Sequence, residues 1–266
     1  MVSCFSMPVT RNNELRSGWQ VKPTFTISLH NKDEKLLKLI NRTLGVGKIY
    51  KHGKNSKVLR VNAIKDLKVI INHFDNYPLM TQKRADFELF KQVIQLMEQG
   101  EHLTKEGLLK IVGIKASLNF GLSDTLKEAF PDIKLTPKKI IEFSKIKDIN
   151  WLVGFAEGEG CFQVVIQNLG EDRINLRFTL TLHSRDKVLM ESLVNYLNCG
   201  REYSAPKRNE VYFIVSKLSD INDKIIPLFE KHPLLGSKYQ DYLDFAKVAK
   251  WVKSKDHLTN GGLKKN

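Results

Sequence analysis

An internal repeat limits the folds open to this chain more than any other feature of its sequence. Leu29–Tyr50 aligns without a gap on Leu182–Tyr203, and Tyr77–Lys83 pairs with His232–Lys238 at a similar offset. This offset of roughly 155 residues is far longer than a solenoid unit, so it indicates a duplicated domain and not an array. We therefore predict a first repeat over residues 1–97, a partly helical linker over residues 98–150 and a second repeat over residues 151–266.

In each copy one segment has polar residues at every second position, as in a strand with one face toward solvent, here called the wet face, and one face buried. Polar and apolar residues alternate over Trp19–Leu29 in the first copy and over Arg173–Leu182 in the second. Such alternation is typical of antiparallel sheets that pack on a core through one face only. Asp33 and Asp186 then stand where helices are expected to begin, and a second hairpin and a proline-led terminal helix complete each copy.

The charge of the chain favours a polyanionic partner. Lysine and arginine number 43 against 29 acidic residues, which gives a net charge of +14 and a pI near 9.6. Such a balance favours nucleic-acid binding, although a lysine excess also follows from an AT-rich genome. The three cysteines show neither Cys-x-x-Cys spacing nor a histidine cluster at zinc distances, so we expect reduced, half-buried thiols.

Nothing in the sequence predicts a membrane partner or an export signal. No apolar stretch approaches the length of a bilayer-spanning helix, and the start has neither a signal peptide nor an arginine-rich presequence. A hydrophobic content of 42% with 27% charged residues is ordinary for a globular domain. We therefore expect a soluble protein.

The run Trp151–Phe162, W-L-V-G-F-A-E-G-E-G-C-F, predicts a helix rich in small residues. Gly154 and Gly158 each cost roughly 1 kcal/mol relative to alanine in a helix interior, so something must offset them. With Ala156 they form a stripe that lets two helix backbones approach closely; a lone buried helix capped by glycine is the alternative. Glu159 falls in the last turn, where the helix dipole disfavours an anion and a hard divalent cation would compensate.

With these motifs in this order, the chain resembles the monomeric two-repeat LAGLIDADG homing endonucleases of fungal mitochondrial introns over almost its whole length. The resemblance implies an α+β fold of two pseudo-symmetric αββαββα domains, each with a saddle-shaped antiparallel sheet that lies in the major groove of double-stranded DNA. It implies a mitochondrial monomer that binds Mg²⁺ through one acid from each motif helix and cuts both strands of a long asymmetric target. Metal ions held by carboxylates supply the activated water and the stabilised leaving oxygen that this hydrolysis needs.

By the same resemblance, Glu159 is the catalytic acid and metal ligand of the second motif, whereas Glu157 is interpreted as a solvated glutamate. Lys83 and Lys238 match the basic positions that help to hold the charge of the transition state. The alternative for each lysine is a surface residue that opens a helix.

The polar faces of the strands are the expected DNA-reading surfaces. Arginine suits guanine, and asparagine or glutamine suits adenine, in the major groove. The residues expected to read the first half-site are Ser6, Thr10, Asn12, Gln20, Lys22, Thr24, Thr26 and Ser28, and those for the second are Gln163, Gln167, Arg173, Asn175, Arg177, Thr179 and Thr181. Further base or phosphate contacts are expected from Lys48, Arg60, Arg201, Lys207 and Arg208. For any single residue the alternative is a solvated side chain.

The N-terminus departs from the family pattern. Aligning Phe5 on Phe162 places Val2 on Glu159, so we expect the first motif helix and its acid to be absent from this sequence. Valine cannot bind Mg²⁺, and we predict that the chain as written makes double-strand breaks inefficiently. A start assigned inside a longer reading frame and a decayed gene each explain the departure.

Two other classes of function stay open. An RNA maturase would use the same basic surfaces to help its host intron fold and would need neither acid, so the missing first acid favours it. The retained Glu159, Lys83 and Lys238 favour a nuclease instead. A sequence-specific regulator would bind DNA without cleaving it. Binding to intron RNA against binding to intronless DNA discriminates the maturase from the nuclease, and the regulator is expected to bind DNA with neither strand cleavage nor affinity for intron RNA.

Overall fold

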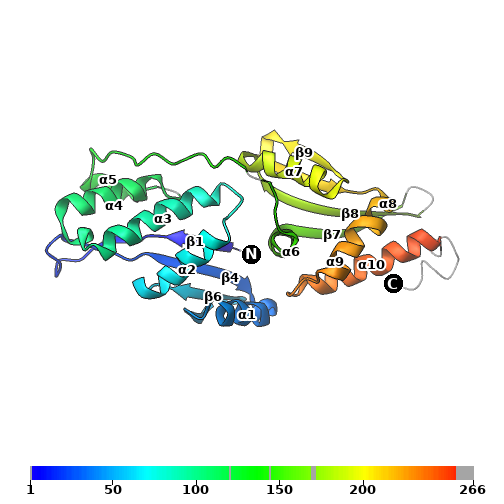
Figure 1. Cartoon of the computed structure of the whole chain (residues 1–266), viewed down its shortest axis with the longest axis horizontal. Helices are drawn as coiled ribbons and strands as arrows, with labels where there is room; N and C mark the ends of the chain where they lie inside the picture. Colours follow the sequence, from blue (N-terminus) through cyan, green and yellow to red (C-terminus); the bar gives the residue numbers. More distant parts are fainter. Residues whose placement is uncertain (1, 120, 144, 169–171, 256–266) are drawn as a thin grey trace. The chain divides into compact units, whose positions relative to one another are not determined.

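The chain divides into two compact units, Met1–Glu142 and Phe143–Asn266 (Figure 1). A computed structural model describes residues 2–119, 121–143, 145–168 and 172–255. Each unit contains a four-stranded sheet with antiparallel pairing throughout. The α+β fold with a four-stranded antiparallel sheet in each repeat is therefore confirmed.

Within the described ranges, no helix is both long and apolar enough to cross a bilayer.

The first unit carries its strands early and its helices late. Its elements are β1 (Val2–Ser6), β2 (Val9–Arg11), β3 (Trp19–Val21), β4 (Thr24–His30), η1 (Asn31–Asp33), α1 (Glu34–Leu44), β5 (Lys48–His52), β6 (Ser56–Val61), α2 (Ile64–Asn76), α3 (Lys83–Glu98), η2 (Glu101–Leu103), α4 (Lys105–Ser117) and α5 (Asp124–Ala129). The main sheet has the order β1-β4-β6-β5, and β2 and β3 form a two-stranded ribbon. Helices α1, α2 and α3 contact the main sheet.

Aromatic side chains form the centre of the core beneath this sheet. The predicted alternation is confirmed in β4, where every second residue is buried. Phe5 is only 1% exposed, and its ring centroid lies 5.3 Å from that of Phe25, 5.5 Å from that of Phe87 and 5.4 Å from that of Phe90. Burying large side chains in this way is the main source of stability in a domain of this size.

Prolines interrupt the first hairpin of this unit. Pro8 separates β1 from β2, and Pro23 separates β3 from β4. Proline has no N–H to donate to a strand ladder, so the pairing cannot run through these positions unbroken. The Lys22 N–H donates to the Pro8 carbonyl oxygen at 2.9 Å, which keeps the two parts of the hairpin together.

Part of the stretch predicted as a linker is folded into the first unit. Helix α4 begins after Thr104, whose side chain accepts a hydrogen bond of 3.0 Å from the Gly107 N–H, the usual stabilisation of a helix start. Leu108 and Ile111 of this helix pack in a second core with Val9 and Val21 of the ribbon. The division between the units falls after Glu142, so residues 98–142 belong with the first unit.

The second unit repeats the order of elements and adds a helix at its start. Its elements are α6 (Ile149–Glu159), β7 (Gly160–Asn168), β8 (Asp172–His183), η3 (Ser184–Asp186), α7 (Lys187–Leu197), β9 (Arg201–Ala205), η4 (Pro206–Arg208), β10 (Glu210–Val215), α8 (Leu218–Asp220), a π-helical turn η5 (Ile221–Ile225), α9 (Ile226–Lys231) and α10 (Lys238–Ser254). The strand order is β7-β8-β10-β9, the counterpart of the first sheet. Helices α6 and α10 contact β7 and β8, and α7 contacts β9 and β10.

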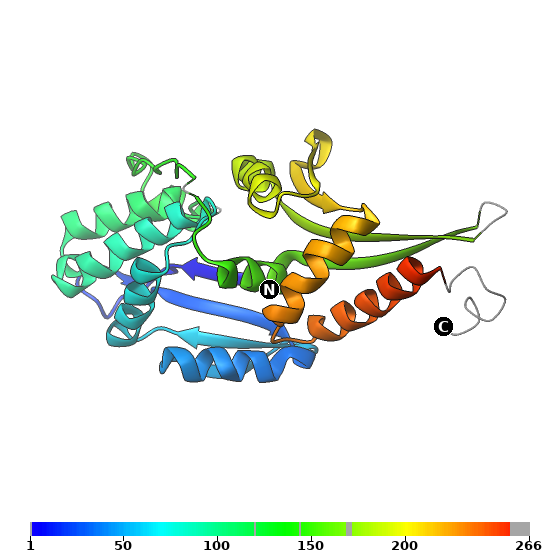
Figure 2. The ribbon, with the colours of Figure 1, turned by 45° about the vertical axis from the view of Figure 1, so that its right-hand side comes forward.

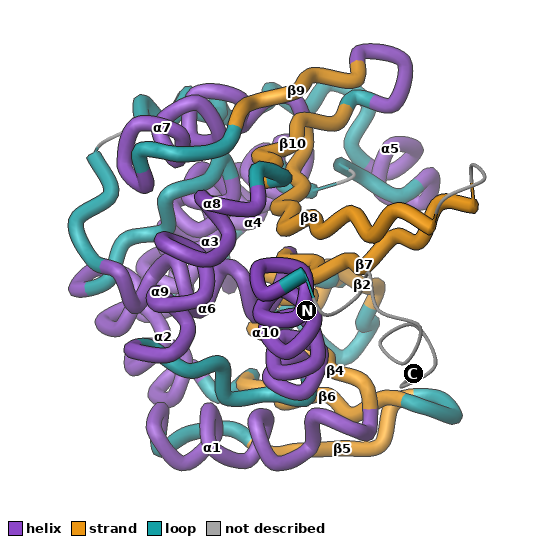
Figure 3. Tube along the Cα trace, turned by 90° about the vertical axis from the view of Figure 1, so that its right-hand side faces the viewer, coloured by secondary structure: helices purple, strands orange, loops and turns teal. Residues whose placement is uncertain are grey.

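The β7–β8 hairpin of this unit is long and uninterrupted, as Figures 2 and 3 show. Its pairing runs from Gly160 opposite Leu180 to Asn168 opposite Asp172. Below it, the ring of Phe162 lies 5.3 Å from that of Phe229 and 5.4 Å from that of Phe245. Phe162 therefore occupies the same central place in its core as its predicted counterpart Phe5.

One matched position of the repeat requires glycine in both copies. Gly47 and Gly200, paired in the alignment, both have positive φ, of 88° and 74°. A Cβ at Gly47 would lie 2.9 Å from the Arg60 carbonyl oxygen, and one at Gly200 would lie 2.8 Å from that of Ile214. Only glycine combines this backbone conformation with this close approach.

Candidate nucleic-acid interface and the end of helix α6

Helix α6 carries the motif run and ends at the acid that the sequence singles out. The Asp148 side chain accepts a hydrogen bond of 2.9 Å from the Asn150 N–H and so begins the helix. Glu159 is its last residue and is exposed. Gly160 follows because a Cβ there would lie 2.5 Å from the Ala156 carbonyl oxygen. The chain thus turns from helix into strand β7 directly after the carboxylate.

Gly154, in the small-residue stripe of α6, has free space beside it in the described chain. Ala156 is fully buried, whereas Gly154 is exposed, and a Cβ added there would have no atom of the described chain within 4 Å. Close helix packing at Gly154 therefore stays a prediction.

Lys238, the first residue of α10, lies at the end of α6. Its Nζ donates to the carbonyl oxygens of Ala156 at 3.2 Å and Gly160 at 2.5 Å. A cation is favoured there because the carbonyl groups of a helix end carry partial negative charge. Burial lowers the pKa of Lys238, and the negative charge of Glu157 is the largest opposing influence. The structure therefore brings Lys238 to the two carbonyl groups that flank the acid-bearing turn.

Glu157 is not the solvated residue that the sequence suggested. Its Oε2 accepts hydrogen bonds from two consecutive backbone N–H groups, at 2.9 Å from Leu235 and 3.0 Å from Gly236. The two acids of the motif therefore differ. The Glu157 carboxylate accepts hydrogen bonds from the loop before α10, whereas Glu159 is exposed. No local sequence signal identifies this contact, because the partners are 78 and 79 residues apart.

The first unit holds Lys83 at the matching place, the start of α3. Lys83 is half-buried. The preceding Gln82 donates to the Ile141 carbonyl oxygen at 2.9 Å and accepts from the Ile141 N–H at 3.3 Å. The loop before α3 is thus held by the chain that leads out of the unit.

Val2, aligned with Glu159, begins strand β1 and pairs with Ser28.

Predicted DNA-reading residues share the wet face of the first sheet. Residues directly opposite in antiparallel strands lie on one face, and Thr26, Arg60 and Lys48 form one such row. The Arg60 guanidinium lies 5.6 Å from the centre of the Tyr50 ring. A hollow of about 550 Å³ is lined in part by Ser6, Lys22, Thr24, Thr26 and Arg60.

The remaining residues of the first set lie on the ribbon and the strand next to it. Thr10 pairs with Gln20 across β2 and β3, and both are at least partly accessible. Asn12 lies in the turn that follows, where its side chain accepts a hydrogen bond of 3.0 Å from the Glu14 N–H. Ser28 is half-exposed on β4. Both strands of the ribbon therefore carry accessible polar residues.

The second sheet presents a corresponding face. Gln163 pairs with Arg177, and both are exposed, as is Asn175 two residues along β8. Arg201 is exposed on β9, and Lys207 and Arg208 are exposed in the η4 turn. Gln167 and Arg173 are paired through their backbones, but their side chains lie outside the described residues.

Thr179 and Thr181 lie in the interior of this sheet and differ from each other. Thr181 is half-exposed, whereas Thr179 is 8% exposed, and its hydroxyl has no hydrogen-bond partner in the described part of the chain. Thr179 lies between Cys161 and Ile214 in the strand register. A contact from Thr179 to DNA stays a prediction.

Two tyrosines on the wet face were missed by the sequence reasoning. Tyr212 and Tyr203 follow Thr181 in one row across the sheet, and their ring centroids are 6.1 Å apart. Tyr203 is 55% exposed. The residues of β10 after Glu210 are all apolar or aromatic, so no polar alternation in the sequence marks Tyr212 as accessible.

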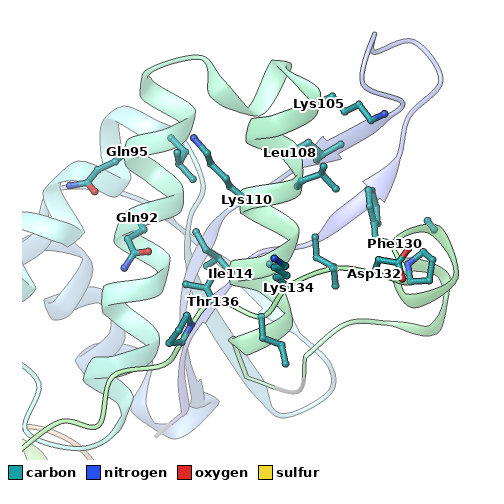
Figure 4. A pocket seen from close by; sticks show the side chains of 18 of the residues that line it. Gln92, Gln95, Lys105, Leu108, Lys110, Ile114, Phe130, Asp132, Lys134 and Thr136 are labelled. Atoms are coloured by element: carbon teal, nitrogen blue, oxygen red, sulfur yellow. The ribbon is translucent and has the colours of Figure 1, made fainter.

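A hollow larger than the one beside the first sheet lies elsewhere in the first unit. This groove of about 1280 Å³ lies between α3, α4 and the segment after α5, as Figure 4 shows. Gln92 and Gln95 line it from α3, and Leu108 and Ile114 from α4. Its lining contains none of the predicted site residues.

Comparison with known proteins identifies the class of this fold. The family model described as LAGLIDADG endonuclease matches residues 2–94 and 152–249. The chain therefore belongs to the LAGLIDADG endonuclease family.

The chain is also similar to particular members of this family. It is 39% identical to the probable intron-encoded endonuclease 2 of Neurospora crassa over 98% of this chain and 60% of the relative. It is 38% identical to the probable intron-encoded endonuclease 3 of the same species, over 97% of this chain and 50% of the relative. The chain thus spans half to three fifths of the length of these curated relatives.

Solved structures of two meganucleases match most of the chain. I-SmaMI bound to an uncleaved DNA target with calcium ions is 39% identical, with a TM-score of 0.95 over 98% of this chain and 91% of that one. I-CpaMI bound to uncleaved DNA is 46% identical, with a TM-score of 0.93 over 98% of this chain and 92% of that one.

Proposed function

We propose that this protein is a site-specific endonuclease that hydrolyses phosphodiester bonds of double-stranded DNA at a long asymmetric target. The observation that carries the proposal is the pairing, in the second unit, of an exposed acid at a helix end with a lysine held beside it: Glu159 and Lys238. The family and the DNA-bound I-SmaMI and I-CpaMI structures support it.

In this proposal each sheet reads one half-site through its wet face. Rows such as Thr26–Arg60–Lys48 and the Gln163–Arg177 pair present donors and acceptors at the spacing of adjacent strands. These side chains suit base edges and phosphates in a major groove. The two faces carry different residues, so the target is asymmetric.

The donor set at the end of α6 suits Mg²⁺. The described residues contain no group of three His, Cys, Asp or Glu side chains that could enclose a metal ion. Magnesium in phosphate chemistry is commonly held by one or two carboxylates together with substrate phosphates and water. One exposed carboxylate, Glu159, fits that role, and the metal when bound polarises a phosphoryl oxygen and lowers the pKa of a bound water.

The residues of the chain then have separate tasks. Glu159 holds the metal at the helix end. Lys238 brings a positive charge to the same place and stabilises the increased negative charge of the reacting phosphate. An ammonium group has three N–H donors, so the contacts to Ala156 and Gly160 leave one for a phosphate oxygen or an ordered water. Lys83 has the corresponding task in the first unit.

We infer that the protein acts as a monomer in fungal mitochondria, encoded within an intron. The names of relatives support the origin in an intron: two are called probable intron-encoded endonucleases of Neurospora crassa, and another is named for intron 1 of ND4 in Podospora anserina. Sedimentation of the protein alone and with a selected duplex checks the monomeric state.

The proposal is tested by selection followed by cleavage. A randomised duplex pool is selected for binding in Ca²⁺, and the selected duplex is then incubated with Mg²⁺ and the products are mapped on both strands. Because cutting both strands is expected to need an acid from each repeat, residues 1–266 are compared with a polypeptide that carries an acid-tipped motif helix fused ahead of Val2. We expect one preferred duplex and faster cutting of both strands by the fused polypeptide.

Two outcomes would contradict this function. One is the absence of any preferred duplex, and the other is tight binding to intron RNA with no cleavage of DNA by either polypeptide. The second outcome would establish a maturase.

A further inference from the structure

We propose that Glu157 is a positioning residue that fixes the loop before α10 and thereby holds Lys238 at the acid-bearing end of α6. The proposal rests on the function proposed above, because it assigns Glu157 a part in cleavage. It also makes a claim about the folded protein that can be tested without cleavage.

The contacts of Glu157 are those of a clamp on a backbone. One carboxylate oxygen, Oε2, accepts from the consecutive N–H groups of Leu235 and Gly236 at 2.9 and 3.0 Å. Hydrogen bonds to an ionised acceptor are about twice as strong as bonds between neutral groups. Lys238 follows Gly236 by two residues and begins α10. A clamp at Gly236 therefore limits where the base of the lysine side chain lies.

The lysine closes the connection back to the same helix. Its Nζ donates to Ala156 and Gly160, the residues on either side of the last turn of α6. The path from Glu157 through the loop to Lys238 and back to α6 thus forms a closed ring of contacts. Glu159 projects from within that turn, so the clamp holds the acid and the cation in a fixed relation.

Apolar packing fixes this loop only in part. Leu234 is 3% exposed and anchors the loop in the core, but the next residue, Leu235, is 65% exposed. Beyond Leu234, polar contacts therefore determine the path of the backbone to Lys238. The carboxylate of Glu157 supplies two of them.

Two variants separate the carboxylate's geometry from its charge. Glu157→Ala removes the acceptor, whereas Glu157→Gln keeps an oxygen at the same reach without the charge. Glu191→Ala is the matched control, because Glu191 is an exposed acid of the same unit whose ion pair with Lys187 is 3.5 Å long. Circular dichroism and thermal unfolding establish that each variant is folded.

The first measurement does not require cleavage. Amide hydrogen exchange at Leu235 and Gly236 and the rate of acetylation of the Lys238 amine are followed in the complete chain. In Glu157→Ala we expect both amides to exchange about tenfold faster, because each loses a bond to a charged acceptor, and we expect faster acetylation of Lys238. Glu157→Gln should lie between this variant and the wild type, and Glu191→Ala should match the wild type. Unchanged exchange and acetylation in a folded Glu157→Ala protein would overturn the proposal.

The second measurement asks whether Glu157 acts through Lys238. On the selected duplex, Glu157→Ala should slow single-turnover strand cleavage by about ten- to a hundredfold, the cost of a small misplacement of a reacting group. Affinity for the duplex in Ca²⁺ should not change, and Glu157→Gln should restore most of the rate. In a Lys238→Ala background, Glu157→Ala should have little further effect, because coupled residues are not additive. Equal slowing in both backgrounds would overturn the proposal.

The two measurements also keep the proposals distinct. If neither residues 1–266 nor the fused polypeptide cleaves a selected duplex, the proposed function fails, while exchange and acetylation still decide whether Glu157 positions Lys238.

Discussion

The two units fold the same series of elements but hold the loop before the proline-led helix in different ways. In the second unit, Glu157 of α6 accepts two hydrogen bonds from the loop backbone. In the first unit, the Gln82 side chain forms two hydrogen bonds with the backbone of Ile141. In both units a segment distant in sequence binds this loop. In the second unit that segment is the preceding helix α6, and in the first unit it is the chain after α5.

A second difference concerns an aspartate in the first turn of that helix. Asp86 in α3 is 6% exposed and its Oδ1 lies 2.5 Å from the Nζ of Lys138. Its counterpart in α10, Asp241, is exposed. A duplicated sequence position thus has a buried ion pair with Lys138 in one copy and an exposed charge in the other.

The aromatic centres of the two cores should give the largest difference in stability. Replacing a buried phenylalanine by alanine costs about 3–5 kcal/mol. We expect Phe5→Ala to reach the upper part of this range, because Phe5 is 1% exposed, and Phe162→Ala to cost less, because Phe162 is only partly buried. Urea unfolding of each variant measures the loss. Equal losses would show that the two cores do not differ in this way.

The buried ion pair should give the next largest effect. Lys138→Met leaves the Asp86 carboxylate buried without this cation, and we expect a loss of about 1–3 kcal/mol in the free energy of unfolding. Asp241→Asn, at the matched exposed position, should change it by less than about 0.5 kcal/mol. The double variant Asp86→Asn with Lys138→Met is the control and should recover part of the loss. An effect of Lys138→Met as small as that of Asp241→Asn would argue against the comparison.

The smallest effect should be a pH dependence confined to the first unit. Burial lowers the pKa of His73, whose counterpart in the second unit is Leu228. Because the folded state disfavours the protonated imidazole, the contribution of His73 to stability is present above the ordinary pKa of about 6.5 and is lost as pH falls through the lowered value. His73→Leu should flatten the dependence of stability on pH below 6.5. Thermal unfolding from pH 7 to pH 5 tests this, and an unchanged slope would contradict it.

Sequence reasoning reached the features whose signal is local or repeated. The alternation along β4 and the end of a helix at Glu159 follow from patterns within a few residues. Such patterns depend on backbone geometry, which a short stretch of sequence largely determines.

The features that it missed depend on contacts between distant parts of the chain. The acceptor role of Glu157 requires a loop 78 residues away, and Thr179 is buried on a strand that pairs with two others. The packing of α4 on the ribbon likewise joins segments that share no repeat. Residue type and spacing alone do not determine such contacts.

The most direct test of the central claim is strand cleavage by Glu159→Gln. This substitution keeps the size of the side chain and removes the negative charge at the end of α6. On the selected duplex with Mg²⁺, we expect cleavage to slow by about a hundred- to a thousandfold, the usual cost of removing one electrostatic stabiliser, with unchanged affinity for the duplex in the absence of metal. Glu191→Gln should cleave like the wild type. Wild-type cleavage by Glu159→Gln would contradict the assignment of the catalytic acid.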